Sequence, residues 1–199
     1  MTTIFDNIDN SLGERLTSTF EASDRIDAAV GYFNLRGWSD LSKVLNERTP
    51  GDDPVARIMV GITLSNHHYR VMEQLQADIN QSEPEPEIDN NLARSRRESA
   101  LHQFRQQLMR GLPTNTDLRA LQMMRKHLVN GLLKVKLFTR RPMHAKTYIC
   151  HRTDVATPII GYVGSSNLTM AGLKHQYELN VDVLDGDAAK KLSTWFNDR

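Results

Sequence analysis

The stretch LKVKLFTRRPMHAKTYIC, residues 133–150, holds two predicted strands and a pair of chemically active side chains. Its first part, Leu133 to Phe138, alternates apolar and basic residues, which is typical of a strand. After a short break, Met143 to Cys150 predicts a second strand. Side chains two positions apart on a strand share one face. We therefore expect His144 and Lys146 to project side by side.

A second motif follows at a predicted strand end. The apolar run Pro158 to Val163 predicts a strand, the turn Gly164 to Asn167 comes next, and Leu168 to Ala171 predicts a first helical turn. Ser and Asn are good N-cap residues, and a helix start presents free N–H groups that suit a phosphate. The sequence therefore predicts an anion pocket where this turn lies beside the strand of His144 and Lys146.

Glu178 completes the set, because it precedes Leu179 to Val183, another alternating run that predicts a strand. A carboxylate there is suited to fix the tautomer of His144 and to stabilise its charged form. Each motif alone is weak evidence, but this order of motifs at strand ends indicates a phosphate site. The expected catalytic residues are His144, Lys146, Asn167 and Glu178, and the expected substrate-binding residues are Ser165, Ser166, Arg140 and Arg141.

These residues resemble the signature of the phospholipase D superfamily, which is His-x-Lys, then an Asp, then Gly-Ser/Gly-x-Asn. The matching positions are His144, Lys146, Gly164, Ser165 and Asn167. Where the family often has the Asp, this chain has His151, and Asp154 follows three residues later. Some nuclease branches of the family lack this Asp and use a downstream Glu, a role that Glu178 suits. The departure therefore weakens a lipase interpretation more than a nuclease interpretation.

The resemblance extends to the N-terminal half. Ile26 to Phe33, followed by Leu35 to Trp38, resembles the opening strand of phospholipase D-like domains at the front of bacterial helicase and restriction proteins, and Val55 to Ile62 resembles their second strand. It implies one α/β domain over residues 1–199, a mixed β-sheet flanked by helices on both faces, with a mobile or helical insertion at residues 80–112. No Gly-x-x-x-x-Gly-Lys-Ser/Thr loop occurs, so the expectation stays open between a stand-alone nuclease and the N-terminal part of a longer helicase-type protein.

The resemblance also implies a reaction without metal or cofactor. His144 would attack phosphorus to form a phosphohistidine, a second histidine would protonate the leaving oxygen, and water would release the product. Lys146, Asn167 and Ser165 would hold the phosphoryl oxygens. Since the chain has one His-x-Lys motif, and single-motif members of the family pair two chains, we expect a homodimer with one composite site.

The expected substrate is nucleic acid, DNA rather than RNA, cut by an endonuclease of restriction or defence. The net charge is only +1, but basic residues surround the predicted site. Arg140 and Arg141 are candidates for backbone-phosphate contacts, whereas Lys134 and Lys136 fit a solvated strand face equally well. Two alternatives stay open: a non-catalytic DNA-binding or dimerisation module of a helicase, and a phospholipid hydrolase or transferase.

Helical periodicity fills the rest of the chain. The predicted helices are Leu12 to Ala22, Leu35 to Leu45, His67 to Ile79, Leu92 to Leu112, Asp117 to Val129 and Ala188 to Phe196. The fourth of them carries Arg94, Arg96, Arg97, Arg105 and Arg110. These arginines either line a nucleic-acid groove or form the polar outer face of an ordinary amphipathic helix.

Cys150 is the only cysteine, so no disulfide forms within the chain, and we expect a reducing, cytoplasmic compartment and a buried, unreactive thiol. No signal peptide is recognised and no apolar stretch is long enough to cross a bilayer, so no membrane partner is expected. The pair His67-His68 is interpreted as a surface pair at a helix start rather than as a metal site. Glu83 to Glu87 predicts a flexible acidic stretch.

Overall fold

The computed structural model describes residues 2–62, 90–108, 110, 114–140 and 142–199. Four of the sequence predictions therefore lie outside the described residues. They are the helix His67 to Ile79, the pair His67-His68, the acidic stretch Glu83 to Glu87 and the substrate-binding residue Arg141.

The described strands form one seven-stranded mixed sheet in the order β1-β7-β6-β5-β2-β3-β4. The strands are β1 (Ile4–Phe5), β2 (Arg25–Val30), β3 (Ala56–Gly61), β4 (Leu133–Phe138), β5 (Lys146–His151), β6 (Ile159–Gly164) and β7 (Asn180–Val183). The pairs β2–β3 and β3–β4 are parallel, whereas β5 is antiparallel to both of its neighbours, β2 and β6. The C-terminal ends of β2 and β6 and the N-terminal end of β5 therefore meet at one end of the sheet.

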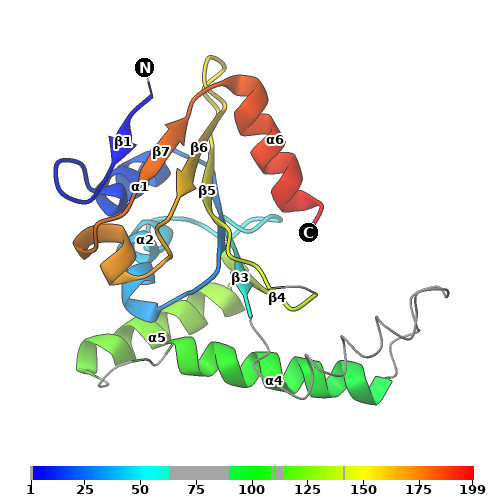
Figure 1. The fold of residues 1–199 in the computed structure, drawn as a ribbon. Helices are drawn as coiled ribbons and strands as arrows, with labels where there is room; N and C mark the ends of the chain where they lie inside the picture. Colours follow the sequence, from blue (N-terminus) through cyan, green and yellow to red (C-terminus); the bar gives the residue numbers. More distant parts are fainter. Residues whose placement is uncertain (1, 63–89, 109, 111–113, 141) are drawn as a thin grey trace, which may run out of the picture.

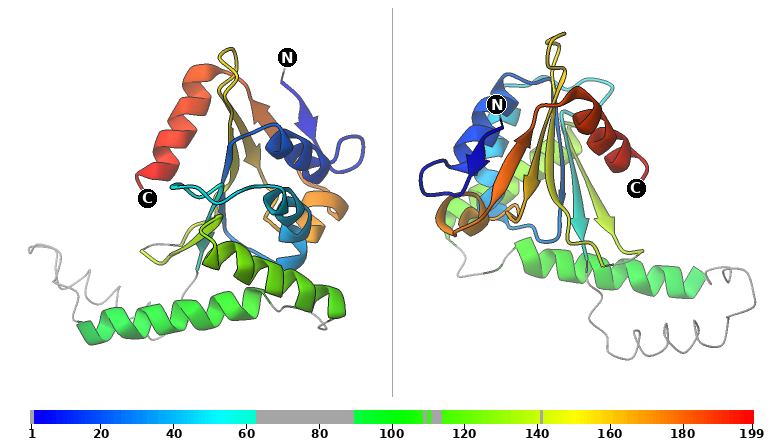
Figure 2. Two further views of the ribbon diagram at one scale, coloured as in Figure 1. Left: turned by 180° about the vertical axis from the view of Figure 1, so that it is seen from behind. Right: turned by 45° about the horizontal axis from the view of Figure 1, so that its top comes forward.

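Helices cover both faces of this sheet, as Figures 1 and 2 show. The helices are α1 (Leu12–Glu21), α2 (Leu35–Asn46), α4 (Asn90–Leu108), α5 (Asn115–Val129) and α6 (Gly186–Asn197), with a short π-helix η1 (Ala171–His175). Helices α1, α2 and α5 lie on one face and α6 on the other, while α4 runs across one end of the sheet (Figure 1). The predicted α/β class, a mixed sheet with helices on both faces, is confirmed.

Local sequence explains where the helices begin. The side chains of Ser11, Asn34 and Asp185 accept a hydrogen bond from the backbone N–H of the first turn of α1, α2 and α6. At the start of α5, Thr114 and Asp117 form a reciprocal capping box. Such caps satisfy N–H groups that have no partner within the helix.

Strand alternation divides the core into two layers. Ile26, Ala28 and Val30 of β2 belong to the larger apolar cluster under α1 and α2, whereas Ala29 belongs to the smaller cluster under α6. Because β2 is central, both of its faces are buried, which explains its nearly continuous apolar run. The single polar exception in this run is Asp27, which is fully buried.

The structure corrects the predicted elements at two points that matter for the site. Strand β5 begins at Lys146 rather than at Met143, so His144 lies in the loop that precedes the strand. The helical turn expected from Leu168 is replaced by a bridge between Leu168 and Phe33, and the helix that follows is the π-helix η1. The short strand β1 was not predicted, because two residues carry too little alternation to be recognised.

Candidate active site

The predicted site residues gather where three loops meet at one end of the sheet. The loops follow β2, precede β5 and follow β6, and these three strands are direct neighbours. Val30 pairs with Lys146, and Thr147 pairs with Val163. The ladder therefore sets the His144 loop between the end of β2 and the turn that carries Asn167.

Gly31 allows the His144 loop to approach the end of β2. A Cβ atom on Gly31 would lie 3.1 Å from the carbonyl oxygen of Met143, 3.2 Å from Cα of His144 and 3.6 Å from Oδ1 of Asn167. A side chain at this position would therefore crowd both motifs. The absence of one lets the backbone of His144 and the carboxamide of Asn167 both approach this glycine.

Asn167 is fixed by a contact with the N-terminal half of the chain. Its Oδ1 accepts a hydrogen bond from the backbone N–H of Tyr32 at 2.9 Å. This bond commits the carbonyl side of the amide to the protein. The Nδ2 group has no hydrogen-bond partner among the described residues, so its two donor hydrogens remain available for an anion.

Lys146 lies beside the backbone of His144. Its Nζ donates a hydrogen bond to the carbonyl oxygen of His144 at 2.9 Å. The His144 side chain is exposed, and no hydrogen bond to its imidazole is found within the described part of the chain. The two residues are thus neighbours as expected, and the ammonium group of Lys146 is hydrogen-bonded to the backbone of the His144 loop.

Glu178 does not make the contact expected for it. We expected its carboxylate to orient His144, but its Oε2 instead accepts a hydrogen bond from the hydroxyl of Ser165. The same hydroxyl accepts a hydrogen bond from the N–H of Leu179 at 2.9 Å. The carboxylate therefore positions a residue of the Gly-Ser-x-Asn turn. Because β7 runs antiparallel to β6, Leu179 lies opposite Ser165 and Glu178 is its neighbour in the chain.

Ser166 lies beneath the turn and is fully buried. Its N–H donates to Oδ1 of Asn180 at 3.2 Å, and its Oγ accepts from Nδ2 of Asn180 at 2.8 Å. Its carbonyl oxygen accepts a hydrogen bond from the hydroxyl of Tyr148 at 2.9 Å. Burial raises the pKa of that tyrosine, with a further contribution from the charge of Glu178. These bonds make Ser166 a support of the turn, and its direct contact with substrate stays a prediction.

The basic residues near the motif divide into two groups. Arg140 is exposed and follows β4 at the same end of the sheet as the site. Arg141 lies outside the described residues. Lys134 lies at the opposite end of β4, and Lys136 donates to the C-terminal carbonyl of Arg199. The solvated-face interpretation therefore holds for these two lysines.

A pocket of roughly 450 Å³ opens beside Asn167. Its lining includes Glu178 and three residues outside the His-x-Lys and Gly-Ser-x-Asn motifs, Tyr32, Arg36 and Arg110. Arg36 is held by two hydrogen bonds of 2.9 Å to Asp117, whereas the guanidinium of Arg110 lies 5.8 Å from the centre of the Tyr32 ring. The sequence signal for Tyr32 was its position directly after Gly31 at the end of β2, and Arg110 was one of the candidate groove arginines.

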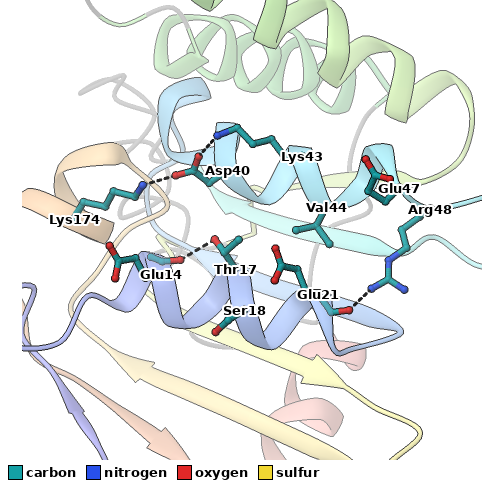
Figure 3. Close-up of a pocket in the computed structure, with 11 residues that line it drawn as sticks. Glu14, Thr17, Ser18, Glu21, Asp40, Lys43, Val44, Glu47, Arg48 and Lys174 are labelled. Atoms are coloured by element: carbon teal, nitrogen blue, oxygen red, sulfur yellow. Dashed lines mark hydrogen bonds and ion pairs between the residues drawn. The ribbon is translucent and has the colours of Figure 1, made fainter.

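A larger pocket of roughly 720 Å³ lies between α1 and α2 (Figure 3). Its basic side chains are already engaged. Lys43 and Lys174 form ion pairs with Asp40, and Arg48 donates to backbone carbonyls at the end of α1. This pocket therefore offers no free cation for a phosphate.

His151, which stands at the position of the family Asp, lies at the opposite end of β5 from the site. Its Nε2 is 2.7 Å from Oδ2 of Asp27 on the adjacent strand. Arg57 donates two hydrogen bonds of 2.6 Å to the same carboxylate. Burial raises the pKa of Asp27, the bonds from Arg57 and His151 lower it, and the net shift is downward. Asp154 pairs with Arg152 at 3.0 Å, so neither residue replaces the family Asp near His144.

Three further observations concern a metal site, a membrane span and the cysteine. In residues 2–62, 90–108, 110, 114–140 and 142–199, no group of three or more His, Cys, Asp or Glu side chains is arranged to hold a metal ion. None of the described helices is both long enough and apolar enough to span a bilayer. Cys150 is buried as expected, and burial raises the pKa of its thiol to about 12.

Comparison with known proteins agrees with the resemblance of the motifs. The family described as "Cardiolipin synthase, PLD-like domain" matches residues 108–199, a range that contains His144, Lys146, Asn167 and Glu178. This part of the chain matches the phospholipase D-like family, so the predicted resemblance is confirmed over residues 108–199. The matched part supplies β4 to β7 and the loops that hold the other predicted catalytic residues beside Lys146.

Solved structures extend the phospholipase D-like fold over the whole chain. NucT from Helicobacter pylori has a TM-score of 0.51 and 13% sequence identity, and the match covers 100% of this chain and 94% of that chain. A phospholipase D family member, Nuc from Salmonella typhimurium, has a TM-score of 0.51 and 12% sequence identity. This match covers 100% of this chain and 93% of that chain. At such low identity these structures establish the shared fold alone. A comparison with curated protein sequences found no match.

Proposed function

We propose that this protein is a metal-independent phosphodiesterase that cleaves nucleic acid, DNA rather than RNA, with His144 as the nucleophile. The observation that carries the proposal is the convergence of three loops at one sheet end. There the backbone of the exposed His144 and the carboxamide of Asn167 lie beside Gly31, and the ammonium of Lys146 donates a hydrogen bond to the carbonyl oxygen of His144. Fixed donors and cations of this kind stabilise charge on phosphoryl oxygens.

The proposed reaction has two steps. An imidazole nitrogen of His144 forms a bond to phosphorus while the bond from phosphorus to the leaving oxygen breaks, and an acid donates a proton to that oxygen. Water then attacks phosphorus, the phosphorus–nitrogen bond breaks, and the imidazole is regenerated. In this scheme the Nδ2 group of Asn167 donates to the phosphoryl oxygens and Lys146 supplies positive charge. Ser165, whose one hydroxyl hydrogen is donated to Glu178, holds the turn that carries Asn167.

The acid of the first step is proposed to be His144 of a second copy, which makes the protein a homodimer with a shared site. An apolar surface beside the turn supports this proposal. Ile4 and Val163 flank Val181 in adjacent strands, and Leu179 and Tyr177 continue the surface next to Glu178. Their exposed fractions are 55% for Ile4, 37% for Val163, 62% for Leu179 and 84% for Tyr177. Burial of such side chains stabilises a twofold contact.

Light scattering at micromolar concentration, with and without DNA, tests the dimer. The wild type is expected to have twice the mass of one chain, and Leu179→Glu is expected to be monomeric and inactive. Val155→Glu is the matched control, because Val155 is 95% exposed in a loop away from this surface. A wild type that stays monomeric in both conditions excludes the shared site.

A phospholipid hydrolase or transferase is the second candidate, because the matching family is described as "Cardiolipin synthase, PLD-like domain". The same donors would hold a phospholipid phosphodiester. A DNA-binding module without catalysis is the third, since it would not need His144 as a nucleophile.

Cleavage of labelled single- and double-stranded DNA in excess EDTA tests the three candidates. We expect the wild type to cut and His144→Ala not to cut, while His102→Ala, which alters an exposed histidine of α4, retains activity. Cleavage that is lost in chelator and restored by magnesium contradicts a metal-independent reaction. DNA binding without cleavage favours the recognition module, and release of headgroup from phospholipid vesicles without DNA cleavage favours the lipid enzyme.

A further inference from the structure

Helix α4 and the residues just after it carry a concentration of positive charge. Between Ala93 and Arg110 the sequence has five arginines and one acidic residue, Glu98, although the whole chain has a net charge of only +1. Arg97 and Arg105 are exposed and have no ion-pair or hydrogen-bond partner among the described residues. Arg94 is exposed as well and pairs only with Glu98, one turn away. This charge is therefore free to bind an anionic partner.

The arginines form a stripe on the outer side of the helix. Arg94, Arg97, Leu101 and Arg105 follow one another at intervals of three or four residues, which places them on one side of a helix. A neighbouring side of the helix packs against the protein, with Ala100 buried and the Phe104 ring 5.8 Å from the ring of Phe33. The stripe is thus held in place, because the same helix packs on the core.

The stripe leads to the pocket beside Asn167. At the C-terminal end of α4, the side chain of Gln107 accepts a hydrogen bond from the N–H of Phe33 at 3.1 Å. The backbone carbonyl oxygen of Gln107 accepts a hydrogen bond from the side chain of Asn34 at 3.4 Å. Arg110, just beyond the helix, lines the pocket together with Tyr32 and Asn167. Figures 1 and 2 show α4 crossing the end of the sheet where these loops lie.

The spacing fits a polymer of phosphates rather than a single phosphate group. Helix α4 has 19 residues and is therefore about 28 Å long, and Arg97 and Arg105 lie about 12 Å apart along its axis. A membrane surface fits less well, since a helix that lies on lipid needs an apolar face directed at the bilayer. On α4 the apolar face is packed on the core, and the outward stripe contains one apolar residue, Leu101.

We propose that the arginine stripe of α4 binds the phosphate backbone of duplex DNA and leads it to the pocket of Asn167 and Arg110. This proposal deepens the proposed function and rests on it for the class of substrate. The contacts are with phosphates, so they position the duplex without reading its sequence. The stripe acts before catalysis, and its residues are not required to touch the reacting phosphorus.

The test is binding of a short labelled DNA duplex by fluorescence anisotropy in EDTA over a range of salt concentrations. Arg97→Ala/Arg105→Ala is compared with Lys134→Ala/Lys190→Ala, which removes two exposed cations elsewhere and leaves the same net charge. Both pairs are made in the His144→Ala background so that the probe is not consumed. We expect the arginine pair to weaken binding by about tenfold and to reduce the slope of log affinity against log salt by about two. The lysine pair is expected to leave both nearly unchanged.

A second measurement separates this proposal from the proposed function. Hydrolysis of bis(p-nitrophenyl) phosphate, a diester too small to reach α4, is measured with the same substitutions in the otherwise wild-type chain. Unchanged hydrolysis together with weakened duplex binding supports the stripe. Equal losses of duplex binding in the two pairs overturn it, even if His144 is confirmed as the nucleophile. Binding that prefers anionic phospholipid vesicles to duplex also overturns it. Duplex binding that depends on the stripe without hydrolysis of either substrate supports the stripe and overturns the proposed function.

Discussion

The side-chain oxygen of Asn167 accepts a hydrogen bond from the backbone N–H of Tyr32 at 2.9 Å, across 135 positions of the chain. This contact ties the Gly-Ser-x-Asn turn to the end of β2. It also orients the amide, because the oxygen is committed to the protein and the nitrogen is left for the ligand. The two ends of one side chain therefore have separate roles, in structure and in binding, which mutation can distinguish.

Asn167→Asp separates these roles. A carboxylate still accepts the hydrogen bond from Tyr32, so we expect little change in the free energy of unfolding. It replaces the amide donors by negative charge beside the phosphate, so we expect phosphodiester hydrolysis to be lost. Asn167→Ala removes both functions and is expected to cost about 1 kcal/mol of stability in addition. Urea unfolding and hydrolysis of bis(p-nitrophenyl) phosphate measure the two effects, and an active Asn167→Asp variant contradicts the proposed role of the amide.

Ser165 and Glu178 are expected to act as one unit, because the carboxylate accepts the hydrogen bond of the serine hydroxyl. The rate of hydrolysis in Ser165→Ala, Glu178→Ala and the double variant forms a double-mutant cycle. We expect the double variant to lose no more activity than the more damaged single variant. Independent, multiplicative losses would instead show that Glu178 acts on another group, such as the imidazole of His144.

Gly164 is expected to tolerate no side chain. A Cβ atom there would lie 2.2 Å from the carbonyl oxygen of Leu179 and 2.6 Å from Cα of Asn180, and both are backbone atoms. Gly164→Ala therefore has to push β6 and β7 apart, at a cost of about 1–3 kcal/mol. Gly51→Ala is the control, since nothing lies within 4 Å of its Cβ position. Thermal unfolding of the two variants measures the difference, and equal melting temperatures would contradict the close approach.

The sequence predicted the parts of the site better than their contacts. Strand β4 has the predicted bounds because its alternation from Leu133 to Phe138 is complete. The start of β5 was predicted too early. The strand-like composition begins at Met143, whereas strand pairing begins at Lys146, which lies opposite Val30, the last residue of β2. Where β2 ends, the chain before Lys146 has no strand to pair with.

The contacts of the side chains depended on geometry that no local pattern carries. The bond from Asn167 to Tyr32 joins distant halves of the chain, and the choice of Glu178 between Ser165 and His144 is made by the register of β6 and β7. The pairing of His151 with Asp27 likewise follows from the antiparallel register of β2 and β5. A motif gives the residue types, and strand register decides which of them meet.

Asp27 is expected to make the free energy of unfolding depend on pH in the acidic range. Its carboxylate is fully buried, and the two bonds from Arg57 help to hold its pKa below the usual value. Because the folded-state pKa is lowered, the stabilisation is present above about pH 4, the unfolded value, and is lost as the pH falls through the lowered pKa.

Asp27→Asn is therefore expected to cost about 3–5 kcal/mol at neutral pH. In the wild type, the stabilisation from Asp27 is lost as the pH falls below about 4. Asp27→Asn should not show this part of the pH dependence. Asp187→Asn, which breaks the exposed pair with Lys191, is the control and should change stability by less than about 1 kcal/mol. Urea unfolding between neutral and acidic pH measures both variants, and a wild type and Asp27→Asn with parallel pH profiles would contradict the role of Asp27.

The central claim is that His144 forms a bond to phosphorus, and intact-protein mass spectrometry tests it most directly. The wild type and His144→Ala are mixed briefly with excess oligonucleotide in EDTA and quenched at alkaline pH, where a phosphohistidine persists. We predict that the wild type gains the mass of one cleavage product, on a peptide that contains His144, and that His144→Ala gains none. Cleavage by the wild type with no adduct on His144 would contradict the account.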